Sequence, residues 1–290
     1  MFTFTYGCEH ADLNITGLES FKIICMNNTD FRYKIGLVLS GGGAKGFAHA
    51  GVIQALEERG IRPDVIAGTS AGAIVGSLYA DGYSPKEIIA FFNKTSFSKF
   101  ATLTRLKGGF FRIDNFKRAL KSKLRAVNFE DLKIPMYINA TDMLHGKNVF
   151  FNSGPLLDVV IASCSVPIVF EPEEIDHIPY SDGGLICNFP VEILRNQCEY
   201  VIGVNVGPIE MDEKEKLTIL DIAQRTYNFM RKANVLSVKD ECDLLIEPPS
   251  IDKYGMFDAE KNQEIFQLGY KAAIGILDKQ QELLDSMKII

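Results

Sequence analysis

The stretch "KIGLVLSGGGAKGFAHAG" (residues 34–51) decides the fold of this chain. An apolar run leads into three consecutive glycines, then Lys45, a fourth glycine, and small residues at helical spacing. A short continuous apolar run is typical of a strand buried on both faces. Backbone amides in a glycine-rich turn that opens a helix converge on negative charge. The stretch therefore predicts a buried strand, an anion-binding loop and a helix.

The same alternation of strands and helices continues along the chain. We expect further strands at 64–69, 135–142, 147–151, 200–206 and 243–248. We expect helices at 44–59, 71–79, from 84 onward, 155–163, 217–239 and 258–286. The helix at 217–239 carries an apolar stripe that includes Ile222, Phe229 and Leu236. Strands that alternate with helices predict a three-layer α/β/α fold with a mainly parallel central sheet.

Length and composition are those of one large globular domain. The chain has 290 residues, 47% of them hydrophobic and 23% charged, and we expect a single hydrolase domain over residues 34–290. Residues 1–33 show no regular hydrophobic periodicity and are expected to form a loosely ordered extension. The first 25 residues do not resemble a secretory signal, and no run of about 18 uncharged apolar residues occurs. A cytoplasmic location follows as an expectation.

The net charge and the spacing of the cysteines exclude several classes of ligand and site. The net charge of −6 argues against nucleic acid. The six cysteines are scattered without a CxxC pair, so neither a zinc site nor a disulfide framework is indicated. We expect no metal and no cofactor, and the sequence leaves the oligomeric state open.

The segment "GTSAG" (68–72) lies between the second strand and the next helix. This G-x-S-x-G pattern in a strand–turn–helix context is typical of a nucleophile elbow, which exposes a serine hydroxyl at the top of a sheet. Gly68 and Gly72 flank Ser70 because the sharp turn leaves no room for Cβ atoms. The glycine loop and this elbow are expected side by side at the carboxyl ends of adjacent parallel strands.

Three interpretations of the glycine loop compete. A phosphate-binding P-loop requires GxxxxGK[ST], but Gly46 is followed by Phe47. A dinucleotide fingerprint matches at Gly41, Gly43 and Gly46, yet the acid that it requires at the end of the next strand is missing, because Asp64 stands at the start of that strand. The glycines could instead serve only a tight turn. Next to a serine nucleophile, the amides of Gly42 and Gly43 could bind an oxyanion.

The serine requires a base, and the histidines are poorly placed to supply one. Of the four histidines (His10, His49, His145 and His177), none follows Asp182. A triad in the order Ser, acid, His would need Asp142 paired with His145 or His177. His145 is expected in a hairpin turn, His177 at the surface and His49 in helix packing. Asp182, in "YSDGGLICNFPVE" (180–192), offers a carboxylate on a tight turn that could take the serine proton directly.

These motifs carry a family resemblance. "GGGAKG" (41–46), "GTSAG" (68–72) and "DGG" (182–184), in this order and spacing, resemble the patatin-like phospholipase family, and the likeness covers roughly residues 34–205. The resemblance implies Ser70 as nucleophile, Asp182 as its base and an oxyanion hole from Gly41, Gly42 and Gly43. It implies lipid acyl hydrolysis without a metal. Supporting positions are Lys45, Gly46, Gly68, Gly72, Gly183 and Gly184. The family often has Arg where this chain has Lys45, which lacks the planar fork needed for bidentate bonding.

A basic, Phe-rich segment spans residues 91–125, with ten Lys or Arg against one acid. Phe116, Leu120 and Leu124 share a helical face there. Such a helix could lie on an anionic membrane, or its apolar face could pack on the core.

We predict a serine acyl hydrolase that acts on lipid or related acyl esters. Two alternatives stay open at this point: a small-ester or thioester hydrolase with no membrane role, and a nucleotide-binding regulatory module built on the glycine loop.

Overall fold

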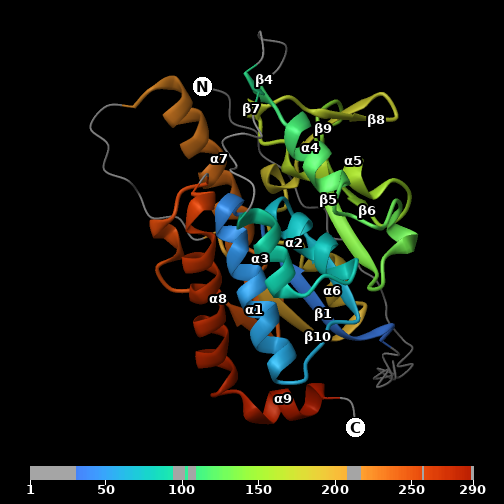
Figure 1. Ribbon diagram of the computed structural model, residues 1–290, viewed down its shortest axis with the longest axis vertical. Coiled ribbons are helices and arrows are strands. Elements are labelled where there is room, and N and C mark those ends of the chain that lie inside the picture. Colours follow the sequence, from blue (N-terminus) through green and yellow to red (C-terminus); the bar gives the residue numbers. More distant parts are fainter. Residues whose placement is uncertain (1–30, 94–101, 104–108, 208–216, 257, 289–290) are drawn as a thin grey trace, which may run out of the picture. The chain divides into compact units, whose positions relative to one another are not determined.

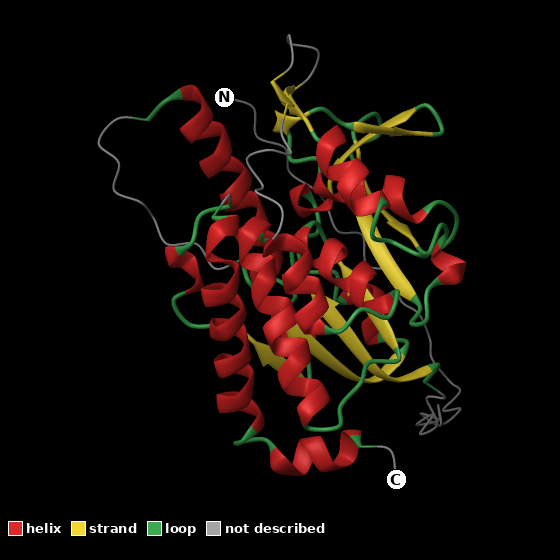
Figure 2. Cartoon of the chain, viewed as in Figure 1, coloured by secondary structure: helices red, strands yellow, loops and turns green. Residues whose placement is uncertain are grey.

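A computed structural model describes residues 31–93, 102–103, 109–207, 217–256 and 258–288. Its central sheet has eight strands in the order β11-β10-β1-β2-β5-β9-β8, with β6 also paired to β5 (Figure 1). The five strands from β11 to β5 pair in parallel, whereas the pairs β5–β6, β5–β9 and β9–β8 are antiparallel. Helices flank this sheet (Figure 2), so the predicted α/β fold with a mainly parallel central sheet is confirmed.

The strands of this sheet are β1 (Tyr33–Leu39), β2 (Val65–Gly68), β5 (Met136–Asp142), β6 (Lys147–Phe151), β8 (Glu173–Ile175), β9 (Ile178–Asp182), β10 (Cys198–Val204) and β11 (Leu244–Ile246). A second, three-stranded sheet contains β3 (Thr102–Leu103), β4 (Gly109–Arg112) and β7 (Ile168–Phe170). The α-helices are α1 (Phe47–Glu58), α2 (Ala71–Ala80), α3 (Pro85–Asn93), α4 (Asp114–Lys121), α5 (Leu156–Cys164), α6 (Glu192–Arg195), α7 (Ile219–Leu236), α8 (Asn262–Leu277) and α9 (Gln281–Met287).

Side chains on β1 alternate between two hydrophobic cores, which explains its continuous apolar run. Leu37 and Leu39 belong to the larger core, which includes residues of α1, α2, α5 and α8. Val38 belongs to the smaller core on the other face, with residues of β10, α6 and α7. Because successive side chains of a strand point to opposite faces, a strand covered by helices on both sides must be apolar throughout.

Two strands run toward each other along one edge of β5. The parallel strand β2 ends with Gly68 opposite Ile138, and the antiparallel strand β9 ends with Asp182 opposite Ala140. The other edge of β5 is occupied by β6 over residues 138–142. The ends of β2 and β9 are therefore only about one residue apart along β5. This head-to-head arrangement brings the elbow after β2 next to the turn after β9.

The predicted elements differ from the structure near the carboxyl end and between residues 168 and 182. The single helix expected at 258–286 is two helices, α8 and α9, separated by residues 278–280. The short strands β7, β8 and β9 were not predicted, because segments of three to five residues are too short to give a clear periodic pattern. By contrast, the expected start of the helix after residue 84 is confirmed. Ser84 donates from its amide and hydroxyl to Glu87, at 2.8 and 2.7 Å, and this pair caps the amino end of the helix.

Candidate active site

Ser70 occupies a strained turn between β2 and α2. Its backbone angles are φ 52° and ψ −116°, in a region that costs a non-glycine residue about 1–3 kcal/mol. The Ser70 amide donates to the Ser163 hydroxyl at 2.8 Å, which anchors the turn on α5. Ser70 is 8% exposed. The turn therefore has the geometry expected of a nucleophile elbow.

Close packing explains the two glycines that flank this serine. A Cβ at Gly72 would lie 2.2 Å from the carbonyl oxygen of Leu39, and a Cβ at Gly68 would lie 2.7 Å from the backbone of Gly72. The amino end of α2 is thereby pressed against the carboxyl ends of β1 and β2. Larger residues at either position would push the elbow away from the sheet.

The glycine loop lies beside the elbow, as expected. A Cβ at Gly41 would lie 3.2 Å from the Cβ of Ser70. Gly43 has φ 61°, which favours glycine, and both Gly42 and Gly43 line the same pocket as Ser70. Within the described residues, the amides of Gly42 and Gly43 donate no hydrogen bond to the protein. They are therefore available to a developing oxyanion.

Gly41 differs from its two neighbours. Its amide donates to the carbonyl oxygen of Asn188 at 3.1 Å, so this amide is already engaged and does not point at a substrate. Of the three glycines predicted to form the oxyanion hole, Gly42 and Gly43 line the pocket and Gly41 does not. Its role is to attach the loop to the segment that follows Asp182.

Lys45 and Gly46 support the loop in different ways. A Cβ at Gly46 would lie 2.6 Å from the Cβ of Ala71, so this glycine permits close contact between the loop and α2. Lys45 lines a second cavity, and burial together with the nearby charge of Arg231 lowers the pKa of its ammonium to about 8. Lys45 therefore places a partly buried, readily titrated cation next to the loop.

Asp182 ends β9 and caps the short 3₁₀ turn Gly183–Leu185. Its Oδ1 accepts from the Gly184 amide at 2.8 Å, and its own amide donates to the carbonyl oxygen of Ser165 at 2.9 Å. A Cβ at Gly183 would lie 2.5 Å from the side chain of Asn139. The two glycines thus let the chain turn tightly around the carboxylate.

The environment of Asp182 raises the pKa of its carboxyl group above the ordinary value. Complete burial is the main cause, and interactions with the Ser70 hydroxyl, the Gly184 amide and Arg231 oppose it. The second carboxylate oxygen, Oδ2, makes no hydrogen bond of regular geometry with the described residues. A desolvated carboxylate with an open acceptor position is suited to removing a proton from a neighbouring hydroxyl.

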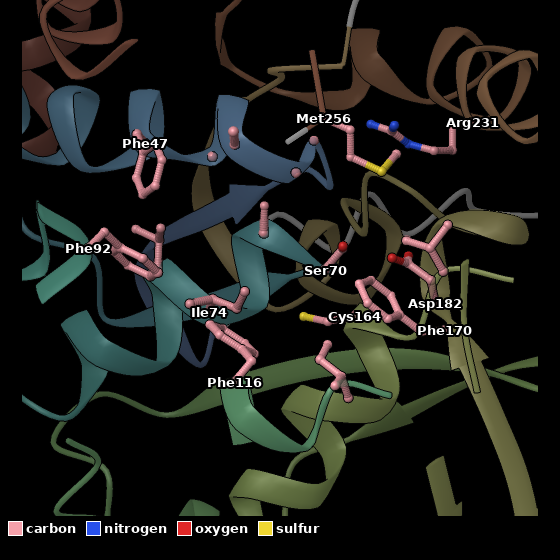
Figure 3. Close-up of a pocket in the computed structure, with 18 of the residues that line it drawn as sticks. Phe47, Ser70, Ile74, Phe92, Phe116, Cys164, Phe170, Asp182, Arg231 and Met256 are labelled. Atoms are coloured by element: carbon pink, nitrogen blue, oxygen red, sulfur yellow. The ribbon is translucent and has the colours of Figure 1, made fainter. Parts of the chain in front are cut away.

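Ser70 and Asp182 share one pocket of about 60 Å³. Figure 3 shows both side chains directed into it and toward each other. Apart from these groups and the glycine loop, the lining is mostly apolar, with Phe47, Ile74, Val75, Phe92, Ile113, Phe116, Cys164, Val166, Phe170 and Met256. The pocket therefore places a polar pair at one end of an apolar chamber.

Arg231, which the sequence analysis did not identify, joins the parts of the site. It is 5% exposed and extends from α7 (Figure 3). Its guanidinium donates to the carbonyl oxygen of Gly41 at 2.7 Å and to Oδ1 of Asn188 at 3.0 Å. On the same helix, the side-chain amide of Asn234 donates to the carbonyl oxygen of Gly184 at 3.2 Å. Helix α7 thus bonds to both loops that form the site.

Tyr227 is a second contribution of α7. Its hydroxyl would lie 2.8 Å from a Cβ at Gly184. Burial and the neighbouring Asp182 raise the pKa of this phenol well above its ordinary value, so it stays neutral. No sequence motif marks Tyr227 or Arg231. The only available signal was their position on the polar face of a helix that follows the motifs.

No described residue that lines the pocket is a histidine. His49 is fully buried, and its Nε2 donates to the carbonyl oxygen of Ser40 at 2.8 Å, in the packing role expected. His145 lies in the β5–β6 turn with Nδ1 2.7 Å from Asp142, and neither residue reaches the pocket. The His177 side chain is 98% exposed. The alternative triads are therefore not assembled.

The basic segment is described only in part, since residues 94–101 and 104–108 lie outside the described residues. In α4, Phe116 and Leu120 are fully buried in the core. Lys117 forms ion pairs with Asp158, at 2.7 Å, and with Glu173. The apolar face of α4 is packed against the protein and is not available to a membrane.

Two further features concern the described residues only. None of their helices has the length and hydropathy needed to cross a bilayer. They also contain no cluster of three or more His, Cys, Asp or Glu side chains arranged to hold a metal ion.

An α/β sheet with a serine at a strand–turn–helix elbow and an amide-lined loop beside it defines the general class of serine-dependent hydrolase folds. The model of the patatin-like phospholipase family matches residues 37–195. The chain belongs to this family, and the match includes both Ser70 and Asp182.

Individual relatives agree with this assignment. The chain is 30% identical over 279 residues to the lysophospholipase NTE1 of Kluyveromyces lactis, covering 86% of this chain but 19% of that protein. It is 38% identical over 164 residues to an uncharacterized NTE family protein of Mycobacterium bovis, covering 54% of this chain and 44% of that protein. The chain thus spans less than half of these relatives.

A solved structure shares the fold. VipD from Legionella pneumophila superposes with a TM-score of 0.58 at 17% sequence identity, covering 86% of this chain and 67% of that one.

Proposed function

We propose that this protein is a lipid acyl hydrolase of the phospholipase A or lysophospholipase type, in which Ser70 and Asp182 form a catalytic dyad. The observation that carries the proposal is the shared pocket, in which the Ser70 hydroxyl faces a buried carboxylate at one end of an apolar chamber. Membership of the patatin-like phospholipase family and the lysophospholipase name of a relative support the substrate class.

The proposed reaction has two half-reactions. The Ser70 hydroxyl attacks the ester carbonyl carbon while Asp182 takes its proton, and the amides of Gly42 and Gly43 stabilise the oxyanion. Collapse breaks the bond to the leaving alcohol, which receives the proton from Asp182. Water then attacks the acyl-serine, again giving a proton to Asp182. The fatty acid leaves, and the proton returns to Ser70.

Two adjoining cavities suit an amphiphilic substrate. The apolar pocket would hold the acyl chain against Phe116 and Phe170. A second cavity of about 140 Å³ shares Gly42, Arg231 and Met256 with the first and adds polar groups, among them Lys45 and Tyr254. The ester would lie near Gly42, where the cavities meet, with the polar part of the lipid on the Lys45 side. This division favours a lipid ester over the small-ester alternative.

The dinucleotide and nucleotide-module alternatives have no comparable support. The pocket beside the glycine loop is predominantly apolar, which suits an acyl chain rather than a ribose and phosphates. A cytoplasmic location and a single hydrolase domain over residues 34–290 remain predictions.

The test is covalent labelling with a fluorophosphonate probe. We expect the wild type to react, Ser70→Ala not to react, and Asp182→Asn to react about 10²- to 10⁴-fold more slowly, because the general base is lost. Ser181→Ala is the matched control: Ser181 is buried beside Asp182, and its hydroxyl makes no hydrogen bond with the described residues. This variant should label normally and release fatty acid from lysophospholipid. Labelling that persists in Ser70→Ala, or full-rate labelling in Asp182→Asn, would contradict the dyad.

A further inference from the structure

Helix α7 turns polar active-site groups toward the protein and leaves large apolar side chains exposed to solvent. Tyr227, Arg231 and Val235 are buried. In contrast, Ile222 is 51% exposed, Phe229 46% and Leu236 56%. A surface helix ordinarily buries its apolar stripe and exposes its polar face. In α7 this arrangement is partly inverted, because the inward face supplies hydrogen-bonding groups of the active site together with the core residue Val235.

Three of the exposed apolar residues lie in line along the helix. Ile222, Phe229 and Leu236 are spaced seven residues apart, which is two helical turns, and Met230, 43% exposed, borders them. We call these four residues the α7 stripe. Figure 1 shows α7 (orange) along the edge of the fold. The helix can therefore present the whole stripe to a partner.

The charge pattern around the stripe indicates the chemistry of that partner. No acidic residue occurs from Ile222 to Lys239, although the chain as a whole carries a net charge of −6. Lys232 is exposed and lies on the same helix along one margin of the stripe. An exposed apolar stripe with Lys232 at its margin and no acidic residue within it fits the interface of an anionic bilayer, where apolar side chains enter the acyl boundary and a cation meets the headgroups.

We propose that the α7 stripe docks this protein on the surface of an anionic lipid bilayer. Because Tyr227 and Arg231 on the opposite face of α7 line the pocket, docking would hold the active site next to the substrate phase. The choice of a bilayer as partner rests on the proposed lipid hydrolase function. The docking surface is α7, not the basic segment of α4, whose apolar face lies in the core.

The first test uses the absence of tryptophan from the sequence. Phe229→Trp, made in the Ser70→Ala background so that lipid stays intact, introduces a single fluorophore into the stripe. We expect a blue shift of its emission with vesicles of phosphatidylcholine and phosphatidylglycerol, weakened by salt. Val127→Trp, at a residue 70% exposed outside α7, is the control and should not shift. An unchanged Phe229→Trp spectrum with these vesicles would overturn the proposal.

A second test separates docking from catalysis. Ile222→Ser/Phe229→Ser should bind these vesicles roughly tenfold more weakly or worse, because two apolar side chains no longer enter the bilayer. Val127→Ser/Leu144→Ser removes equally exposed apolar side chains elsewhere and should bind normally. All variants should hydrolyse a water-soluble short-chain ester at the wild-type rate, which shows that they fold.

The outcomes distinguish the two proposals. Loss of ester hydrolysis in Ser70→Ala concerns the function, whereas vesicle binding by that variant concerns docking alone. Equal vesicle binding by the stripe variant and the wild type would overturn docking. A concentration-dependent dimer that buries the fluorophore of Phe229→Trp without vesicles would also overturn it, in favour of a second copy of the chain as the partner.

Discussion

Arg231 donates a hydrogen bond to the carbonyl oxygen of Gly41, a residue 190 positions earlier in the chain, at 2.7 Å. The amide of the same Gly41 donates to Asn188, and Oδ1 of Asn188 accepts from Arg231. A buried guanidinium therefore holds the glycine loop and the segment after Asp182 in fixed positions. We expect the orientation of the neighbouring Gly42 and Gly43 amides to depend on this connection.

Replacing Arg231 should reduce turnover more than substrate binding. Arg231→Lys keeps the charge but loses the fork, and we expect kcat to fall about tenfold to hundredfold with little change in KM, because the oxyanion donors are misplaced. Arg231→Met should also lower the free energy of unfolding by about 1–3 kcal/mol, because the carbonyl oxygen of Gly41 loses its buried donor. Steady-state kinetics and urea unfolding measure these effects.

A pH profile distinguishes positioning from a purely structural role. The charge of Arg231 lowers the pKa of Asp182, so Arg231→Met should move the acidic limb of kcat to higher pH, whereas Arg231→Lys should leave it nearly in place. Arg118→Lys, at an exposed arginine on α4, is the control. An unshifted acidic limb in Arg231→Met would show that the charge of Arg231 does not affect the pKa of Asp182.

Asp182→Asn should lower the activity and raise the thermal stability of the protein. Because burial raises the pKa of this carboxyl in the folded state, its protonated form favours folding, and stability is lost as pH rises through the folded pKa. At pH 7 the uncharged amide of the variant avoids this cost, so we expect a higher melting temperature together with the loss of activity. The difference should vanish below about pH 3.9, where the wild-type carboxyl is protonated in both states.

A second buried aspartate provides the contrast. Asp81 accepts from the amides of Arg125 and Ala126 at 2.8 and 3.2 Å, so its carboxylate is satisfied by the fold. Asp81→Asn should lower the melting temperature at pH 7, since one of its acceptor oxygens becomes a donor. If Asp182→Asn melts lower than the wild type in the same scan, the Asp182 carboxylate is not the destabilising group described above.

His49 should make the protein sensitive to acid. Burial lowers the pKa of its imidazole to about 4. The unfolded state therefore binds a proton near pH 6.5 while the folded state does not, and about 3 kcal/mol of stability should be lost as pH falls from 6.5 to 4. His49→Gln keeps a donor for the carbonyl oxygen of Ser40 and should lose less. Unfolding in urea at several pH values measures this.

The exposed His177 supplies the matched control for that series. Its side chain is 98% exposed, so His177→Gln should follow the wild-type pH dependence. A wild-type loss of stability that is the same in His49→Gln would assign the acid sensitivity to another group.

The first part of the site could be predicted because its determinants are local. The apolar run of β1, the glycine loop and "GTSAG" specify strand, loop and elbow within about 40 residues of one another. Gly68 and Gly72 were assigned their packing role from the sequence, and the close approach to Leu39 confirms it. Asp182 was found through its two glycines, although its catalytic role stays a prediction.

The contribution of α7 could not be predicted in the same way. Its apolar stripe predicted the helix, and a stripe normally marks the buried side. The inward side carries Arg231 and Asn234 instead, whose partners Gly41 and Gly184 are remote in sequence. Hydrophobic periodicity predicts which residues share a face of a helix, but it does not predict their hydrogen-bond partners. The orientation of α7 and the hydrogen bond of the Gly41 amide could therefore not be predicted from the sequence.

Helix α7 also determines how much of this chain would be needed to transfer the active site to another protein. The stretch that matches the family model ends at residue 195 and holds both the serine and the aspartate, yet the guanidinium that locks their loops together comes from residue 231. A chimera that contained only the matching stretch would include Ser70 and Asp182 but not Arg231, which holds their loops together. Under the proposed mechanism, the smallest active part of this chain therefore extends through α7.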